Sequence, residues 1–144
     1  MTPPPAGWPR LSSALFYQDA SAAIAFLERA FGFETRIRID GPDGLVEHSE
    51  LVYGGAVVMV SSLGRHPWGT SPKAQGGLNT QSLFLYVPDV DAHCARARAA
   101  GAGVVKDPVD TDYGAEWWAD RGYGATDLEG HYWWFATRIR NPPE

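Results

Sequence analysis

One order of elements occurs twice in this chain. A strand-like run at 13–17 leads into a helical pattern at 19–32, and the run 82–87 leads into a second helical pattern at 89–101. Both helical patterns begin at an aspartate, a favoured N-cap, and both close with a glycine. This repetition predicts an α+β fold in which two tandem βαβββ modules form a curved mixed sheet around a cup. We expect any binding or chemistry to take place in that cup.

Turn signals divide the rest of the sequence into strands and loops. The strands that complete the two modules are expected at 34–40, 45–53 and 56–61, and at 104–108, 116–126 and 131–137. The expected organisation is a Pro-rich lead-in at 1–10, module one at about 11–62, a Gly- and Pro-rich connector at 63–80, module two at about 81–137, and a tail at 138–144. Residues 11–137 are thus expected to form a single domain.

The composition excludes several classes of partner. With 144 residues, 44% of them hydrophobic, the chain is long enough for one domain with a core. The net charge of −5 is spread without a basic stripe, so we expect neither nucleic acid nor a membrane surface as a partner. No apolar run is long enough to span a bilayer and no signal peptide is evident, which predicts a cytoplasmic protein. On the second helix, the single cysteine, Cys94, is expected to be buried and His93 to be exposed.

Three motifs in the second half resemble those of a known superfamily. They are Tyr-Val-Pro-Asp-Val-Asp-Ala-His at 86–93, Ala-Ala-Gly-Ala at 99–102 and Asp-Leu-Glu-Gly-His-Tyr-Trp at 127–133. Together with the duplication, they resemble the vicinal oxygen chelate superfamily, which includes glyoxalase I, bleomycin-resistance proteins, extradiol dioxygenases and fosfomycin-resistance enzymes. The resemblance covers residues 11–137 and implies the paired βαβββ fold. It also implies a homodimer, because the family commonly completes its cups between chains.

Enzymes of this superfamily usually bind one divalent metal through the first and last strand of each module. The resemblance places the four ligand positions at Ser12, Met59, Ser82 and Trp134. None of these residues offers the imidazole, carboxylate or thiolate that zinc, nickel, manganese or iron prefers. We therefore predict no metal and no cofactor at this position.

Strand alternation identifies the residues that share a face with those four positions. They include Phe16, Phe84, Tyr86 and Tyr132, and Trp118 is expected on a neighbouring strand. These rings have two interpretations, as core packing or as a stacking pocket for a flat or amphipathic ligand. In the second interpretation the polar anchors are Ser12 and Ser82, and the walls are Phe16, Met59, Phe84, Tyr86, Trp118, Tyr132 and Trp134.

Two polar groups offer alternative sites. His48 and Glu50 share one strand face and are candidates for a displaced metal site or an acid–base pair, although no third ligand is evident. Glu116, Asp120 and Arg121 form the densest charged cluster near the predicted aromatic strand. That cluster is either an ordinary surface ion pair or a site where Glu116 acts as a base.

The sequence favours metal-independent binding of an aromatic or hydrophobic small molecule, as in bleomycin-resistance proteins. The alternative is a metal-dependent lyase, isomerase or dioxygenase of the same superfamily, with a relocated metal site around His48 and Glu50. A third interpretation is a partner-binding protein that makes its contacts through the segment 63–80. For the first interpretation, the expected partners are a small-molecule ligand and a second copy of the chain.

Overall fold

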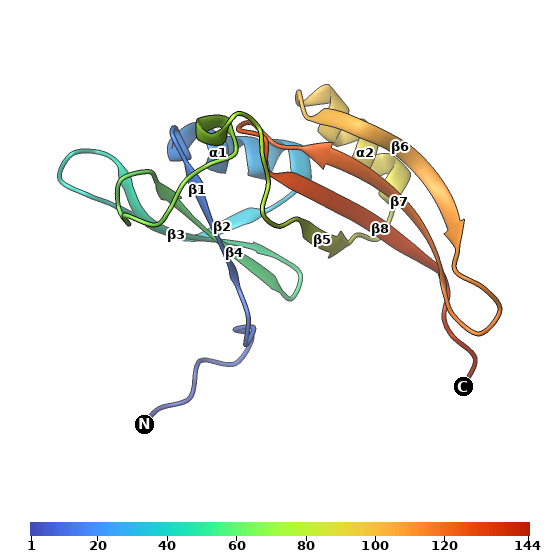
Figure 1. Ribbon diagram of the computed structural model, residues 1–144. Coiled ribbons are helices and arrows are strands. Elements are labelled where there is room, and N and C mark those ends of the chain that lie inside the picture. The colour runs from blue at the N-terminus through green and yellow to red at the C-terminus, as the bar shows by residue number, and fades with distance from the viewer.

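Each half of the chain builds a four-stranded sheet with a helix on one face (Figure 1). The structure is a computed structural model that describes residues 1–144. The first module contains β1 (Ser13–Tyr17), α1 (Ala20–Phe26), a π-helical turn η1 (Leu27–Phe31), β2 (Glu34–Asp40), β3 (Val46–Tyr53) and β4 (Ala56–Ser62). The second contains β5 (Leu83–Tyr86), α2 (Val90–Ala99), β6 (Gly103–Asp112), β7 (Ala119–Thr126) and β8 (Tyr132–Arg140). The connector carries one short 3-10 helix, η2 (Lys73–Gln75). The predicted duplication of a βαβββ unit is confirmed.

The two sheets have the same topology. Their strand orders are β1-β4-β3-β2 and β5-β8-β7-β6. In each sheet the first strand of the module pairs in parallel with the last, and the other pairs are antiparallel. As a result, β1 and β5 are edge strands, and the curved mixed surface consists of two sheets.

The helices begin where the sequence predicts. The side chain of Asp19 accepts a hydrogen bond from the backbone N–H of Ala22, and Asp89 accepts one from Ala92. After α1 the chain continues through η1 and ends its helical path at Gly32, whose φ of +81° is left-handed. The N-caps and the glycine therefore fix both ends of the helical segment in the first module.

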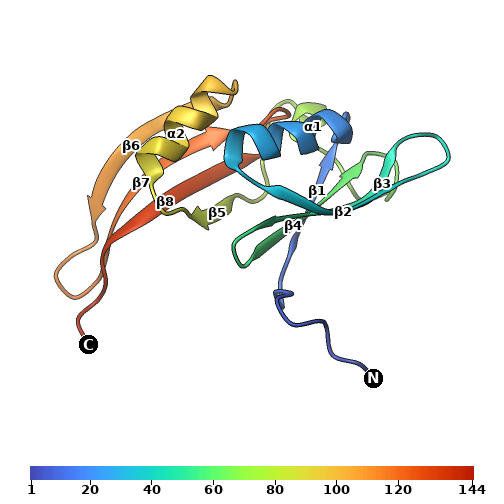
Figure 2. The ribbon, with the colours of Figure 1, turned by 180° about the vertical axis from the view of Figure 1, so that it is seen from behind.

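The two helical segments lie next to each other on the same side of both sheets (Figure 2). The core lies between these helices and both sheets, and an aromatic cluster forms its part over the second sheet. Trp133 and Phe135 are buried and nearly parallel, and Phe31 of η1 lies with its ring centroid 5.4 Å and 4.8 Å from theirs. This packing buries one face of each sheet and joins the two modules.

His93 is one of the groups that join the modules. Its Nδ1 lies 2.7 Å from the hydroxyl of Tyr123, and its Nε2 lies 2.9 Å from the carbonyl oxygen of Phe31. The prediction that His93 is exposed was wrong, since only 8% of the residue is accessible. The reason is that α2 packs against η1 of the first module, a contact that helix periodicity within α2 cannot reveal. Burial lowers the pKa of the imidazole, so a neutral ring donates to Phe31 and accepts from Tyr123.

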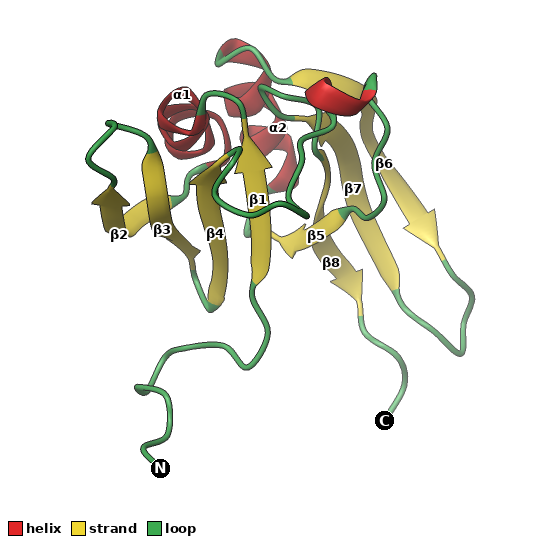
Figure 3. Ribbon diagram, turned by 60° about the vertical axis from the view of Figure 1, so that its left-hand side comes forward, coloured by secondary structure: helices red, strands yellow, loops and turns green.

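The opposite faces of the sheets are not covered by α1 or α2 and splay apart (Figure 3). We call them the open faces.

Several strand ends also differ from expectation. The strand β6 continues to Asp112 beyond the expected end at 108, because it still pairs with β7 there. The last strand, β8, continues to Arg140 beyond the expected end at Thr137, because β7 still pairs with it there. Trp117 and Trp118 lie in the turn before β7, which begins at Ala119. No helix is long and apolar enough to cross a membrane.

Candidate functional site

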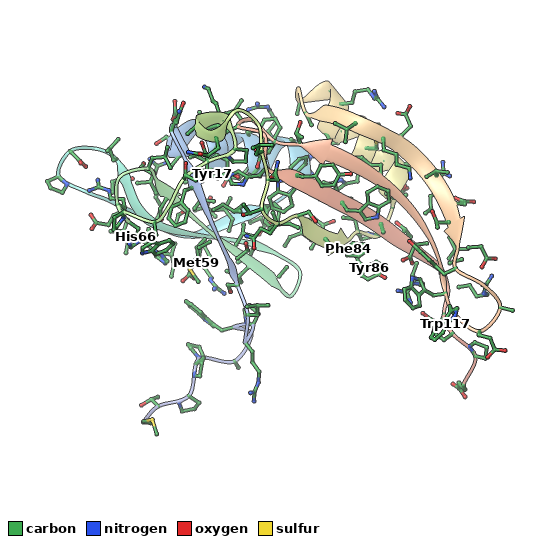
Figure 4. The ribbon with its side chains drawn as sticks, viewed as in Figure 1. Tyr17, Met59, His66, Phe84, Tyr86 and Trp117 are labelled. Carbon is green, nitrogen blue, oxygen red and sulfur yellow. The ribbon has the colours of Figure 1, made fainter.

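The open face of the second sheet carries four aromatic side chains. Phe84 and Tyr86 come from β5, and Tyr132 and Trp134 come from β8, at alternating positions that point away from the helices. Phe84 is 54% exposed and Tyr86 is 46% exposed, and their ring centroids are 5.0 Å apart. Figure 4 shows these two side chains below β5, on the open side of the molecule. We call these four residues the aromatic wall.

Two glycines make room for the ring of Trp134. Gly122 and Gly124 of β7 lie beside it on the same face, and a Cβ on Gly122 would lie only 2.8 Å from the indole Nε1. The indole therefore lies against the glycine backbone. Lys106 of β6 places its ammonium 5.3 Å from the ring centroid, within cation–π range. This end of the wall thus combines a flat ring with a cation.

A guanidinium orders the other end of the aromatic wall. Arg138 lies with its Cζ 5.0 Å from the ring centre of Tyr86 and 5.6 Å from that of Trp118. Its Nε donates to Asp120 at 2.5 Å, and its Nη2 donates to the Tyr86 hydroxyl. The carboxylate of Asp120 is buried, and the pairing raises the pKa of Arg138. Trp118, which lies in the turn before β7, is therefore linked to the aromatic wall through Arg138.

The predicted charged cluster does not form. Asp120 and Arg121 are consecutive strand residues and point to opposite faces of β7. Arg121 forms ion pairs with Asp91 and Asp110, both at 2.8 Å, on the side of the helix. Glu116 is exposed in the turn before β7 and belongs to neither group. The three side chains therefore do not form one cluster, and Arg121 makes ordinary surface ion pairs.

A cavity of about 460 Å³ opens between the edge strands β1 and β5. It is lined mostly by hydrophobic side chains, among them Val57 and Phe84, and Ser12 and Ser82 lie at its wall. We call it the inter-sheet cavity. The geometry brings Ser12, Ser82 and Phe84 together at this one cavity.

A second cavity of about 450 Å³ lies between β1 and the connector. Phe16 and Trp68 line it, with ring centroids 5.2 Å apart, and the imidazole of His66 stacks on Trp68 at 4.8 Å. Ala14 and Gln81 belong to both cavities, so the two hollows adjoin along β1. Trp68, which is 70% exposed, was not among the site residues that the sequence predicted.

Comparison with known proteins identifies the family of this chain. The family model described as Glyoxalase/Bleomycin resistance protein/Dioxygenase superfamily matches residues 11–135. The chain belongs to this superfamily. The uncharacterized protein Rv0887c of Mycobacterium tuberculosis is 35% identical over 135 residues, which cover 92% of this chain and 76% of that protein.

Two solved structures have a similar fold. The crystal structure of TioX from Micromonospora sp. ML1 is 34% identical in sequence, with a TM-score of 0.71, and the match covers 91% of this chain and 99% of TioX. TnmS3, an antibiotic binding protein from Streptomyces sp. CB03234, is 21% identical with a TM-score of 0.64, over 88% of this chain and 93% of TnmS3. The second likeness concerns the fold alone.

Within one chain, the residues expected to bind a ligand fall into separate groups. The inter-sheet cavity holds Ser12, Ser82 and Phe84, and the connector cavity holds Phe16. Tyr86, Tyr132 and Trp134 stand on the second sheet, with Trp118 reaching them through Arg138. Met59 lies on β4 of the first sheet, opposite Glu50 of β3. The alternation of each strand was predictable, but the splay of the two sheets was not.

Lys106 and Arg138 are further site residues that sequence reasoning missed. Both are cations next to aromatic rings of the wall. Arg138 alternates with Trp134 and Ala136 along β8, so strand period contained a signal for it. It was missed because the strand was expected to end at Thr137. For Lys106, the register shifts along β6 obscure the alternation.

The superfamily's metal positions do not suit a metal here. Ser12, Ser82, Met59 and Trp134 offer hydroxyl, thioether and indole groups, which bind divalent cations poorly. No group of three or more His, Cys, Asp or Glu side chains is arranged to hold a metal ion. The residues present therefore do not fit the metal centre of the superfamily's enzymes.

His48 and Glu50, the candidates for a displaced metal site, do not provide a metal site either. His48 Nε2 lies 3.2 Å from Glu50 Oε1, as the shared strand face predicts. The other oxygen, Oε2, accepts hydrogen bonds from Arg36 Nε at 3.1 Å and Nη2 at 2.7 Å. The third group at this position is therefore a cation, which would repel a metal ion.

Proposed function

We propose that this protein binds a small aromatic or hydrophobic molecule without a metal, in a cup lined by the aromatic wall. The observation that carries the proposal is the exposure of several rings on one sheet face. Four large aromatic side chains stand together there, and Phe84 and Tyr86 are about half exposed. A soluble domain seldom leaves such a group of rings uncovered unless the surface binds something.

The chemistry of the wall suits a flat ligand. Aromatic faces stack on planar groups, and the hydroxyl group of Tyr132 can orient a polar substituent. The adjoining inter-sheet cavity supplies an apolar hollow with Ser12 and Ser82 as hydroxyl anchors. TnmS3, which shares the fold, is an antibiotic binding protein, and this supports a similar class of ligand here.

The proposal includes a homodimer. The two open faces splay apart within one chain, so neither face closes over a ligand by itself (Figure 3). A second copy that places its first sheet against the aromatic wall would bring Met59 and Phe16 of one chain toward Trp134 of the other. The complete cup then forms between chains, as the resemblance implies. The expected cytoplasmic location stays a prediction.

The test is a titration of the protein in EDTA with bleomycin and a panel of planar aromatic antibiotics, followed by tryptophan fluorescence. We expect saturable quenching by at least one compound. Phe84→Leu and Trp134→Leu should each weaken its binding by about 30-fold or more, equivalent to about 2–4 kcal/mol. Leu128→Ala is the control, because Leu128 is 49% exposed in the turn between β7 and β8 and does not belong to the aromatic wall. Equal losses in all three variants, or no saturable ligand, would contradict the proposal.

A further inference from the structure

The lead-in at 1–10 makes a specific contact with the first sheet. The ring centre of Trp8 lies 3.9 Å from the Cζ of Arg36 on β2, so the two groups are in contact. Figure 1 shows the lead-in leaving β1 on the side away from the helices, which is the side of the open faces. Trp8 thus covers a side chain of the first open face.

A local turn brings the indole back to the sheet. The backbone N–H of Trp8 donates to the carbonyl of Pro5 at 3.2 Å, and Gly7 within this turn has a φ of +84°. Glycine adopts that backbone conformation without strain. The turn fixes the direction of Trp8 even though residues 1–6 are exposed.

A bulge places Arg36 on the open face. The register of β2 against β3 shifts between Thr35 and Ile37, so the residue between them is out of the regular alternation. Thr35 faces the helix side, where its hydroxyl donates to Glu28. Arg36 instead reaches Glu50 of β3.

Glu50 holds the guanidinium in place. The carboxylate belongs to a residue that is only 4% exposed, and it accepts two hydrogen bonds from Arg36 while its other oxygen lies beside His48. Burying a carboxylate is costly unless it is paired in this way. The pairing through Nε and Nη2 fixes the plane of the guanidinium, and a fixed plane of this kind stacks well on aromatic rings.

We propose that Arg36, held by Glu50, is a stacking site for a planar aromatic group, and that Trp8 fills this site in the free protein. The ligand at this site is thus a flat aromatic ring, and in the free protein the indole of Trp8 occupies its position. The site adds a planar surface to the first open face, whose own exposed rings are few. An external aromatic group has to displace Trp8 to bind there. The site is distinct from the aromatic wall on the second sheet.

Indole itself is the appropriate probe, because it reproduces the side chain of Trp8. We expect Trp8→Ala to bind indole saturably in an NMR titration, with shifts at the backbone amides of β2 and β3. The wild-type protein should bind it about ten-fold more weakly, because Trp8 competes from the same chain. Trp117→Ala, which removes another exposed tryptophan, should create no site.

A second substitution tests the role of the guanidinium plane. Arg36→Lys keeps the cation that Glu50 needs, so the sheet should stay folded, but it removes the planar surface. Trp8→Ala with Arg36→Lys should lose about ten-fold in indole affinity relative to Trp8→Ala alone. The matched control is Trp8→Ala with Arg38→Lys, because Arg38 of the same strand pairs with Asp40 and Ser21.

The outcomes separate this inference from the proposed function. Equal indole binding by the Arg36→Lys and Arg38→Lys variants, or no binding by Trp8→Ala, would overturn the stacking site. Neither result depends on whether a ligand binds to the aromatic wall. If an antibiotic quenches the tryptophan fluorescence in a way that Trp134→Leu abolishes and that added indole does not change, that result would support the proposed function. The stacking site would still be tested separately by indole.

Discussion

The hydroxyl of Tyr17, at the end of β1, donates a hydrogen bond of 2.7 Å to Asp127, which lies in the turn between β7 and β8. The two residues belong to different modules. Close by, Glu129 of the same turn accepts the backbone N–H groups of Gln18 and Asp19, at 2.8 Å and 2.9 Å. Two carboxylates of the second module therefore bind the strand end and the helix start of the first. This connection fixes the two modules to each other within one chain.

Tyr17→Phe should destabilise the protein. The substitution removes a buried hydrogen bond to a carboxylate, which is worth about 1.5–3 kcal/mol of unfolding free energy. Asp127 keeps its bonds from Trp133 Nε1 and from backbone N–H groups, so the loss should stay within that range. Urea denaturation measures it. Tyr113→Phe, at an exposed tyrosine, should change stability by less than about 0.5 kcal/mol, and an equal loss there would contradict this role of Tyr17.

Stability should fall as the pH drops below about 6.5, because of His93. Burial lowers the pKa of the folded imidazole below its ordinary value of 6.5, so the unfolded chain takes up the proton first. His93 therefore contributes full stability above the unfolded value, and this contribution is lost as the pH falls from there toward the folded pKa. Denaturation between pH 7 and pH 5 measures the slope. His93→Gln, which stays neutral and can still hydrogen-bond, should flatten it, and an unchanged slope would exclude His93 as the cause.

Gly122→Ala should displace Trp134 from the aromatic wall. A Cβ there would lie within 2.8 Å to 2.9 Å of three atoms of the indole, so the ring has to move. We expect a loss of about 1–3 kcal/mol of unfolding free energy, a changed near-UV dichroism spectrum and weaker binding of any aromatic ligand. Gly55→Ala is the control, because an added Cβ there meets nothing within 4 Å and its φ is not left-handed. Identical spectra for Gly122→Ala and the wild-type protein would show that Trp134 does not depend on this glycine.

Light scattering on the purified protein should give twice the chain mass of 15.7 kDa. The physical reason is that each chain leaves two open faces, with exposed rings on the second sheet, and a second copy can cover both. A monomer at micromolar concentration would contradict the homodimer and leave the cup open. Analytical ultracentrifugation of Phe84→Leu then shows whether that ring stabilises the dimer or contributes only to ligand binding.

Local signals in the sequence predicted most of the fold. Asp19 and Asp89 cap their helices as expected, since capping depends only on residues in the next turn. The alternation along β5 and β8 predicted which side Phe84, Tyr86 and Trp134 share. These features depend on neighbours in sequence or on a single strand, so they are readable without the structure.

Contacts between distant segments were not predictable. His93 is buried because η1 of the other module packs on it. Trp117 and Trp118 are strong strand formers, yet they lie in a turn where Asp112 accepts the N–H of Gly114 at 2.8 Å. Long-range packing and a side-chain cap outweigh local propensity at these positions.

The stacking of Trp8 on Arg36 could not be predicted from the sequence either. A Pro-rich lead-in indicates extended chain, and nothing in its composition says which strand it meets. The bulge that turns Arg36 outward leaves no clear mark in the alternation of β2. The site residues of the first sheet could therefore be predicted from the sequence less well than those of the second sheet.

The most direct test of the account is calorimetric titration of the purified protein with the best ligand of the antibiotic panel, once in EDTA and once with one equivalent of zinc or manganese. Because the superfamily's metal positions hold Ser12, Met59, Ser82 and Trp134, we predict the same dissociation constant in both conditions. Elemental analysis of the sample should find far less than one metal per chain. Binding that appears only with the metal, or about one tightly held metal per chain, would contradict metal-independent binding.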